Sequence, residues 1–211
     1  MTIRPASDRS LLISFGNQIS LDSHQHVTRL THALERAPGV LNLHPAYTTV
    51  LVDFDPRRCT HAEMDALVRG RFDEAVAREL VPPRSVEIPV HYGGEFGPDL
   101  DDVARHTGLS TERVIEFFAG ADYVVYFVGF ATCFPYLGVL PPQLATPRLS
   151  APRKHVPAGS IAIGGAQAGV YPLASPGGWR IIGRTMLRLF DVASAPPPLL
   201  RMGDHVRFLH A

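Results

Sequence analysis

Net charge is absent from this sequence, because its 20 Lys and Arg residues are balanced by 20 Asp and Glu residues. Basic residues do not form a run interleaved with aromatic residues, so we expect no nucleic-acid partner. Long apolar runs are missing as well, and none approaches the roughly 18 residues that are needed to cross a bilayer. These absences predict a protein that is soluble and has no membrane partner.

Cysteine is scarce, with only Cys59 and Cys133 in the chain. Two cysteines are too few for the disulfide framework that is typical of small secreted proteins. The opening segment MTIRPASDRS also lacks the basic stretch and apolar core of a secretory signal. A cytoplasmic location is therefore predicted.

Motifs for metal and nucleotide chemistry are missing too. The 10 histidines show no metal-ligand spacing, and neither HExxH nor CxxC occurs, so no metal site is predicted. The glycine-rich residues 164–169 are not followed by the Gly-Lys-Ser/Thr of a phosphate-binding loop, and the segment after them has a strand pattern. A hairpin is favoured there, and we expect this chain itself to bind no cofactor.

What the chain does contain is enough sequence, 211 residues, for two small domains. The first part combines strand patterns with apolar residues at helical spacing. The strands are expected at 10–15, 40–44 and 48–54, and the helices at 21–36 and 60–80. Asp22 or Ser23 is expected to cap the first helix. A small α/β domain is thus predicted for residues 1–83, ending at Pro82 and Pro83, which favour extended chain.

Residues 84–211 have the pattern of a β-barrel domain. Strand candidates separated by turn signals lie at 86–91, 123–129, 160–164, 169–172, 179–185 and 205–209. Two short helices are expected at about 99–107 and 111–119, the second capped by Ser110. Many short strands with frequent turns are typical of a closed or nearly closed barrel. The predicted fold class is therefore α+β, a small α/β domain followed by a barrel domain.

Residues 127–185 are the most informative segment, because they concentrate Gly, Pro, aromatic residues and isolated Arg. Gly and Pro fix tight turns, aromatic side chains form apolar walls, and Arg offers a planar fork to an anion. We therefore expect a walled cavity here. The candidate walls are Phe127, Phe130, Phe134, Tyr136 and Tyr171. Core packing alone also selects such residues, and it is the commoner explanation.

A series of short motifs runs through this segment. In order, they are Gly129-Phe130, Tyr136-Leu137-Gly138, Leu144-Ala145-Thr146-Pro147-Arg148, Val156-Pro157-Ala158-Gly159-Ser160, Tyr171-Pro172-Leu173, Ser175-Pro176-Gly177-Gly178-Trp179 and Ile182-Gly183-Arg184-Thr185. Together they closely resemble the family of carboxyltransferase subdomains C and D. That family includes allophanate hydrolase subunit 1, the B-type subunit of bacterial 5-oxoprolinase and the inhibitor of sporulation kinase A. Weaker similarity extends over nearly the whole chain.

The resemblance implies a cyclophilin-like barrel and a subunit that acts with a larger barrel-fold subunit of the C type. In the leading interpretation, the chain is the B-type subunit of an ATP-dependent 5-oxoprolinase that converts 5-oxo-L-proline to L-glutamate, with ATP used by another subunit. Alone, it is expected to be inactive. One alternative is a subunit of an allophanate hydrolase or urea-type carboxyltransferase, and another is an inhibitor of a histidine kinase. The sequence leaves these interpretations open.

Arg184 and Gln167 are the leading candidates for binding a small amide substrate. Arg184 falls in a predicted strand, with its side chain expected to point toward the barrel interior or a mouth. There it can hold a substrate carboxylate, or it can pair with Asp122 or Asp191 to stabilise the fold. Gln167 can bind the substrate amide. The catalytic residues are not identified.

Further candidates lie in the loops around these strands. Arg148 and Arg153 form either a solvated surface, which is favoured, or a basic rim for an acidic ligand or a partner subunit. Ser175 opens a family motif and is also predicted to contact substrate. His155 is interpreted as a surface residue rather than a general base.

The chain departs from the family pattern in this segment. The family pattern is Gly-Phe-x-Pro-Gly-Phe, and in this chain Thr132-Cys133 stands in place of its Pro-Gly. Val139 stands where the family typically has Gly, and Ala168 stands where Thr is common. A side chain in place of Gly restricts the backbone, so a pocket that this loop touches is expected to be reshaped. Cys133 itself is interpreted as a small buried hydrophobe rather than a nucleophile.

Overall fold

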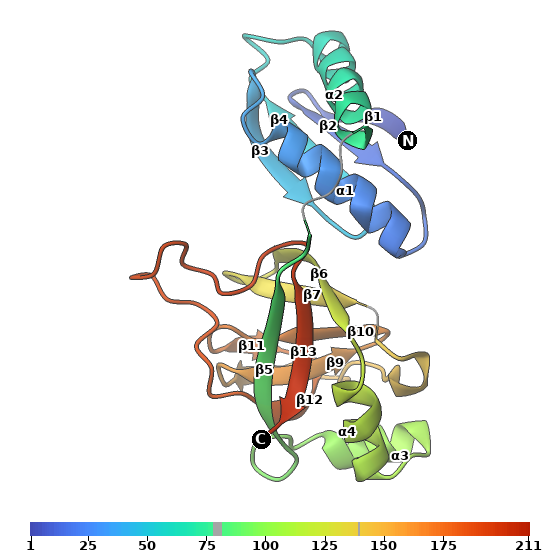
Figure 1. Ribbon diagram of the computed structural model, residues 1–211, viewed down its shortest axis with the longest axis vertical. Coiled ribbons are helices and arrows are strands. Elements are labelled where there is room, and N and C mark those ends of the chain that lie inside the picture. The colour runs from blue at the N-terminus through green and yellow to red at the C-terminus, as the bar shows by residue number, and fades with distance from the viewer. Residues whose placement is uncertain (78–81, 139) are drawn as a thin grey trace. The chain divides into compact units, whose positions relative to one another are not determined.

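The structure is a computed structural model that describes residues 1–77, 82–138 and 140–211 (Figure 1). Two positions used in the sequence predictions, Leu80 at the end of a helix and Val139 in a family motif, lie outside the described residues.

Two compact units make up the chain, Met1–Pro82 and Pro83–Ala211. The first is a four-stranded antiparallel sheet in the order β1-β2-β4-β3, with two helices that contact the sheet and each other. Its elements are β1 (Thr2–Ser7), β2 (Ser10–Ser14), α1 (Leu21–Leu34), β3 (Val40–Pro45), β4 (Thr49–Phe54) and α2 (His61–Val76). The sequence predicted all of them except β1, whose residues are almost all exposed and carry no apolar alternation.

Side-chain caps explain where the helices of this unit begin. Ser20 Oγ accepts a hydrogen bond from the Ser23 backbone N–H at 3.1 Å, so Ser20 caps α1 and the predicted caps Asp22 and Ser23 are wrong. Thr60 caps α2 in a capping box, because its side chain and that of Glu63 each bond the other's backbone N–H.

The second unit is built around a closed barrel with the strand order β10-β7-β6-β13-β5-β12-β9. The barrel strands are β5 (Ser85–Tyr92), β6 (Tyr123–Gly129), β7 (Phe134–Gly138), β9 (Ser160–Gly164), β10 (Gln167–Val170), β12 (Arg180–Arg184) and β13 (His205–His210). The other elements are α3 (Leu100–Thr107), α4 (Thr111–Ala119), the 3-10 turn η1 (Pro142–Leu144) and a separate two-stranded sheet of β8 (Arg153–Val156) and β11 (Ser175–Gly177). The predicted α+β class, a small α/β domain followed by a barrel, is confirmed.

The glycine-rich residues 164–169 form part of the β9–β10 hairpin. Gln167 pairs with Gly164, and Gly169 pairs with Ala162. No helix follows, because β10 runs on to Val170. The hairpin interpretation is confirmed.

The barrel has an apolar interior and a second apolar cluster on the outside of its wall. On β9, Ile161 and Ile163 belong to the interior core, whereas Ala162 belongs to the outer cluster. Alternation of side chains along a strand accounts for this division. The buried members of the outer cluster are Phe134, Val156, Ala162, Tyr171, Trp179 and Ile181. This outer cluster positions the candidate site.

The first and last strands of the unit, β5 and β13, pair with each other and complete the barrel. They run parallel, in register from Ser85 opposite His205 to Val90 opposite His210. The two strands lie side by side in Figure 1. Among the described residues, the helices are all too short or too polar to cross a membrane.

Candidate ligand-binding site

The candidate site lies on the outer face of the barrel wall, where small residues leave room for aromatic rings. Tyr136, Gly169, Ala162 and Ile181 are successive cross-strand neighbours on β7, β10, β9 and β12. A Cβ added at Gly169 would lie 2.6 Å from the Phe134 ring, so that ring rests directly on the backbone of β10. The small side chains of this face therefore create the space for the site.

Phe134 is the centre of a cluster of rings. Its ring centroid lies 5.0 Å from that of Tyr171, 5.1 Å from that of Tyr136 and 5.5 Å from that of Trp179, with edge-to-face geometry in each pair. Trp179 rests on Gly164 of β9, where an added Cβ would be 2.5 Å from the indole. Edge-to-face contacts and close packing on the backbone hold the rings in one arrangement.

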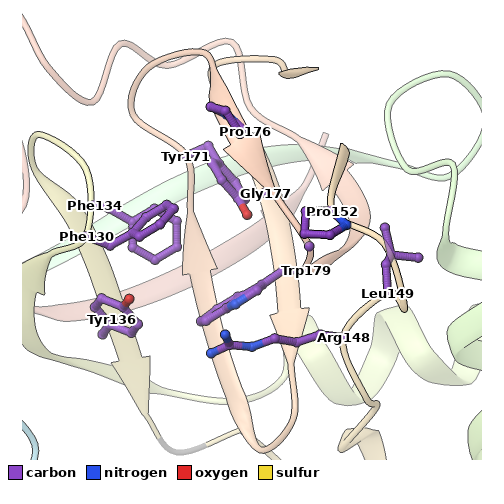
Figure 2. Close-up of a pocket in the computed structure, with 11 residues that line it drawn as sticks. Phe130, Phe134, Tyr136, Arg148, Leu149, Pro152, Tyr171, Pro176, Gly177 and Trp179 are labelled. Atoms are coloured by element: carbon purple, nitrogen blue, oxygen red, sulfur yellow. The ribbon is translucent and has the colours of Figure 1, made fainter. Parts of the chain in front are cut away.

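A cavity of about 310 Å³ opens over this ring cluster. Figure 2 shows Phe134 and Tyr136 on one side, Leu149 and Pro152 on the other, and Trp179 between them. The lining residues are Phe130, Phe134, Tyr136, Arg148, Leu149, Pro152, Tyr171, Pro176, Gly177, Gly178 and Trp179. They come from β7 and the loop before it, from the residue that follows β10, from β11 and the two residues after it, and from the segment before β8.

Arg148 brings a positive charge to this apolar cavity. Its guanidinium carbon lies 5.5 Å from the centroid of the Trp179 ring, in a cation–π contact. Figure 2 shows the side chain running beside the indole. Burial raises the pKa of both Tyr136 and Tyr171, and the charge of Arg148 opposes that rise. The guanidinium is thus electrostatically coupled to both hydroxyls at the site.

Tyr171 is fixed at its hydroxyl end as well as at its ring. Burial raises its pKa, and a hydrogen bond from the Trp179 backbone to the hydroxyl partly offsets the effect. A Cβ added at Gly177 would lie 2.2 Å from Tyr171 Oη, so the glycine makes space for the hydroxyl. With a raised pKa, the hydroxyl is protonated at neutral pH and can donate a hydrogen bond.

Residues 1–200 match the family model of the carboxyltransferase domain, subdomain C and D. The chain belongs to this family. Its relatives include the B-type subunit of 5-oxoprolinase from Escherichia coli O157:H7, which is 45% identical over 96% of this chain and 92% of its own length. The corresponding 5-oxoprolinase subunit from Bacillus subtilis (strain 168) is 40% identical over 98% of this chain and 91% of its own length. A putative urea carboxylase from Emericella nidulans is 30% identical over 88% of this chain but only 18% of its own length.

Solved structures share the fold of this carboxyltransferase-family chain. TTHA0988 is 39% identical with a TM-score of 0.85, and the match covers 96% of this chain and 40% of that chain. This chain thus spans well under half of TTHA0988. PH0987 from Pyrococcus horikoshii, described as a conserved uncharacterized protein, is 43% identical with a TM-score of 0.60, covering 100% and 97% of the two chains. The Kluyveromyces lactis urea amidolyase, 21% identical with a TM-score of 0.78, has the same fold.

The residues predicted to bind substrate in this carboxyltransferase-family chain divide into two groups. Those that line the cavity are Phe130, Tyr136, Arg148 and Tyr171. Those outside the cavity lining are Gln167, Ser175, Arg153 and Arg184. A substrate-binding role stays a prediction for both groups.

Arg184 lies on the outer face of the barrel rather than in its interior, and a β-bulge is the reason. The pairing of β12 with β9 shifts register between Ile181 and Gly183, and Arg184 then pairs with Ser160 on the outer face. A one-residue shift reverses the alternation of side chains beyond it. The guanidinium lies 4.9 Å from the centroid of the Phe96 ring.

The acidic partners predicted for Arg184 are engaged elsewhere. Asp122 pairs with Arg207 at 2.6 Å, and Asp191 pairs with Arg188 at 3.0 Å. The prediction that either carboxylate pairs with Arg184 is therefore wrong.

Arg153 is an anchored residue. Its Nη2 donates to Asp99 Oδ1 at 2.6 Å, and Asp99 Oδ2 accepts from the Ile181 backbone N–H at 2.7 Å. Asp99 is only 3% exposed. The favoured interpretation of a solvated surface is therefore wrong for Arg153, whereas His155 is exposed as predicted.

Gln167 and Ser175 lie near the cavity without lining it. Gln167 shares the outer face of β10 with Gly169, two residues further along the strand. The Ser175 hydroxyl is buried, and it has no hydrogen-bond partner among the described residues.

The loop that departs from the family pattern has an unusual backbone. Phe130 and Cys133 have φ angles of 63° and 60°, in the left-handed region that favours glycine. Glycine at the position of Cys133, as in the family pattern, would adopt this conformation without a steric penalty. Burial raises the pKa of the Cys133 thiol, so little thiolate forms at neutral pH and the residue is a poor nucleophile.

Sequence reasoning missed Trp179 as a cavity wall. It is the only tryptophan of the chain and directly follows Gly177-Gly178. The outward positions Ala162 and Gly164 of β9 and Gly169 of β10 are small, which is the signal that large rings pack on them. In the part of the chain that the structure describes, no group of three or more His, Cys, Asp or Glu residues is placed to hold a metal.

Proposed function

We propose that this chain is the B-type subunit of an ATP-dependent 5-oxoprolinase and assists the conversion of 5-oxo-L-proline to L-glutamate. The observation that carries the proposal is the 45% identity with the B-type 5-oxoprolinase subunit of Escherichia coli O157:H7, over 96% of this chain and 92% of that one. Similarity over nearly all of both chains supports a common role, whereas similarity to one domain of a larger enzyme supports only a common fold.

The chemistry of the cavity fits a subunit that binds substrate and leaves bond cleavage to its partners. The described lining residues include no Asp, Glu, His, Lys or Cys, the side chains that most often act as general acids, bases or nucleophiles. Burial raises the pKa of Tyr136 and Tyr171, which keeps both from acting as bases near neutral pH. Positioning and charge stabilisation remain as the contribution of this chain, which is inactive alone.

Two partners complete the proposed complex, a larger barrel-fold subunit of the C type and a subunit that uses ATP. The ATP site is assigned to a partner because residues 164–169 form a β-hairpin, without the following helix whose N-terminus would bind phosphate. The chain itself binds no cofactor in this proposal. Its two cysteines are free thiols, which supports a cytoplasmic location for the complex.

The test is to co-express the chain with its candidate barrel-fold partner and ATP-using subunit, and to measure glutamate formed from 5-oxo-L-proline with ATP. Formation of glutamate is expected only when all three chains are present. Omitting each chain in turn is the control. A stable three-chain complex that forms no glutamate would contradict the proposal.

The urea-type alternative is less well supported. The putative urea carboxylase of Emericella nidulans is 30% identical, and the match covers 18% of its length. The urea amidolyase of Saccharomyces cerevisiae is 22% identical over 13% of its length. Urea supplied to the same complex in place of 5-oxo-L-proline tests this alternative directly.

A further inference from the structure

We propose that the cavity lined by β7 and β11 binds a small ring bearing a carboxylate, and that Arg148 is the residue that holds the carboxylate. The inference rests on the proposed function, since 5-oxo-L-proline is a ring of this kind. It deepens that function by assigning charge recognition to Arg148 on the cavity wall. The apolar part of the ligand is assigned to the more accessible aromatic walls of the cavity, the exposed Phe130 and the partly buried Tyr136.

Among the described residues that line the cavity, Arg148 is the cation available to a ligand. Its neighbours are committed to the fold, because Arg153 pairs with Asp99 at 2.6 Å and Arg180 pairs with Asp102 at 2.9 Å. The ion pairs of the described residues include none that engages Arg148. An arginine on an apolar wall without a carboxylate of its own can receive one from a ligand through two parallel N–H donors.

The surroundings of Arg148 favour an anion over a cation or a neutral ligand. The described lining residues contain no carboxylate that would repel a bound anion. Burial raises the pKa of Tyr136 and Tyr171, so both hydroxyls are neutral and can donate hydrogen bonds. The contact with Trp179 also restrains the guanidinium plane before ligand arrives, which lowers the entropic cost of binding.

Size and shape point to a small, partly apolar molecule. The cavity volume of about 310 Å³ is near the lower end of the range for small-molecule sites, about 300–1,000 Å³. Aromatic walls suit the methylene face of a lactam ring. Urea offers neither an apolar face nor a carboxylate, and a site built around a charged contact binds poorly an analogue that lacks the charge.

Trp179 provides a direct readout, because the only tryptophan of the chain lies in the cavity. We would titrate the full chain with 5-oxo-L-proline and with 2-pyrrolidinone, the same ring without its carboxylate, and follow tryptophan fluorescence. The expected result is a saturable change with 5-oxo-L-proline and an affinity for 2-pyrrolidinone that is weaker by about tenfold or more. No saturable change with 5-oxo-L-proline, or equal affinity for both compounds, would overturn the inference.

Arginine variants identify the residue responsible. Arg148 is exposed, so Arg148→Met is expected to keep the fold and to weaken 5-oxo-L-proline binding by about tenfold or more. Arg148→Lys keeps the charge without the planar fork, so its affinity for 5-oxo-L-proline is expected to lie between that of the unmodified chain and that of Arg148→Met. Arg113→Met is the matched control, because Arg113 also lies over a ring, Phe117 at 4.5 Å, but outside the cavity lining. Unchanged binding by Arg148→Met, or an equal loss in Arg113→Met, would overturn the assignment.

The three-chain complex separates failure of this inference from failure of the proposed function. If the complex forms glutamate, Arg148→Met is expected to raise KM for 5-oxo-L-proline by about tenfold or more. An unchanged KM would remove Arg148 from the site and leave the proposed function in place. If the complex forms no glutamate while the full chain still distinguishes the two compounds through Arg148, the carboxylate site stands and the proposed function fails.

Discussion

At the scale of single residues, the site depends on positions that have no side chain. The rings of Phe134 and Trp179 lie on Gly169 and Gly164, at distances where a Cβ would collide with them. The aromatic residues are therefore held by contact with the barrel backbone, and their orientation is set by the strands beneath. A side chain added at either glycine therefore displaces a wall of the cavity.

Gly164→Ala tests this dependence. An added Cβ would lie 2.5 Å from the Trp179 indole, so the variant is expected to lower the free energy of unfolding by about 1–3 kcal/mol, the usual range for overpacking. Gly178→Ala is the matched control beside the same ring, because the nearest atoms to its Cβ would be those of Pro152, at an ordinary contact distance of 3.6 Å, and a change within about 0.5 kcal/mol is expected. Urea unfolding monitored by tryptophan fluorescence measures both. Equal stability of the two variants would contradict the packing argument.

Cys133 is a second position where backbone geometry predicts the effect of a substitution. Its φ of 60° is costly for any residue with a Cβ, so Cys133→Gly is expected to be more stable than Cys133→Ala by about 0.5–1 kcal/mol. The alanine variant removes the sulfur and keeps the strain, which makes it the control. Chemical unfolding of the two proteins gives the comparison. A more stable alanine variant would show that the loop does not hold the left-handed conformation.

At the scale of elements, Asp99 joins three parts of the second unit. It immediately precedes α3, accepts from Arg153 at the start of β8 and accepts from the Ile181 backbone N–H in β12. A buried carboxylate with these partners fixes the positions of α3 and β8 relative to the barrel strand β12. The segment that carries Arg148 runs directly into β8, so this contact also stabilises one side of the cavity.

Asp99→Asn is expected to lower the free energy of unfolding by about 3 kcal/mol, because it leaves the partly buried Arg153 without its counter-charge. Arg105→Ala removes an exposed pair with Asp102 in the same helix and is the control, with an expected change within about 1 kcal/mol. Denaturant titration of both variants tests the difference. A loss no greater for Asp99→Asn than for the control would mean that the buried pair adds little.

The elements themselves were largely predictable from sequence, and the exceptions have physical causes. Apolar spacing predicted α1 and α2, and turn signals predicted most of the barrel strands. Among the barrel strands, β7 was not predicted. β8 and β11 were missed because they are short and pair only with each other across an intervening hairpin. The orientation of Arg184 was missed because a bulge reverses the alternation within β12. The cavity walls were partly predicted, as aromatic residues, but their meeting on the outer face depends on cross-strand neighbours that local patterns do not encode.

At the scale of the whole molecule, the two units have separate cores. The first buries alternate residues of β4, Val50, Val52 and Phe54, against its helices, and the second has the barrel interior and the outer cluster. The sole tryptophan belongs to the second unit. Fluorescence therefore reports on one unit, and far-UV circular dichroism reports on both.

We expect two unfolding transitions by circular dichroism and one by fluorescence, because units with separate cores lose their structure separately. Urea titration followed with both probes on the same samples makes the measurement. Coincident single transitions in the two probes would show that the units unfold together.

The pairing of β5 with β13 has a consequence for how the protein is made. These strands are the first and last of the second unit, so β5 leaves the ribosome long before its neighbour is synthesised. Contacts between residues so distant in the chain form late and slow the folding of a domain. We expect the first unit to fold while translation continues, and the barrel only once β13 has emerged. A partner that needs the finished barrel wall would then meet its binding surface only after β13 has emerged.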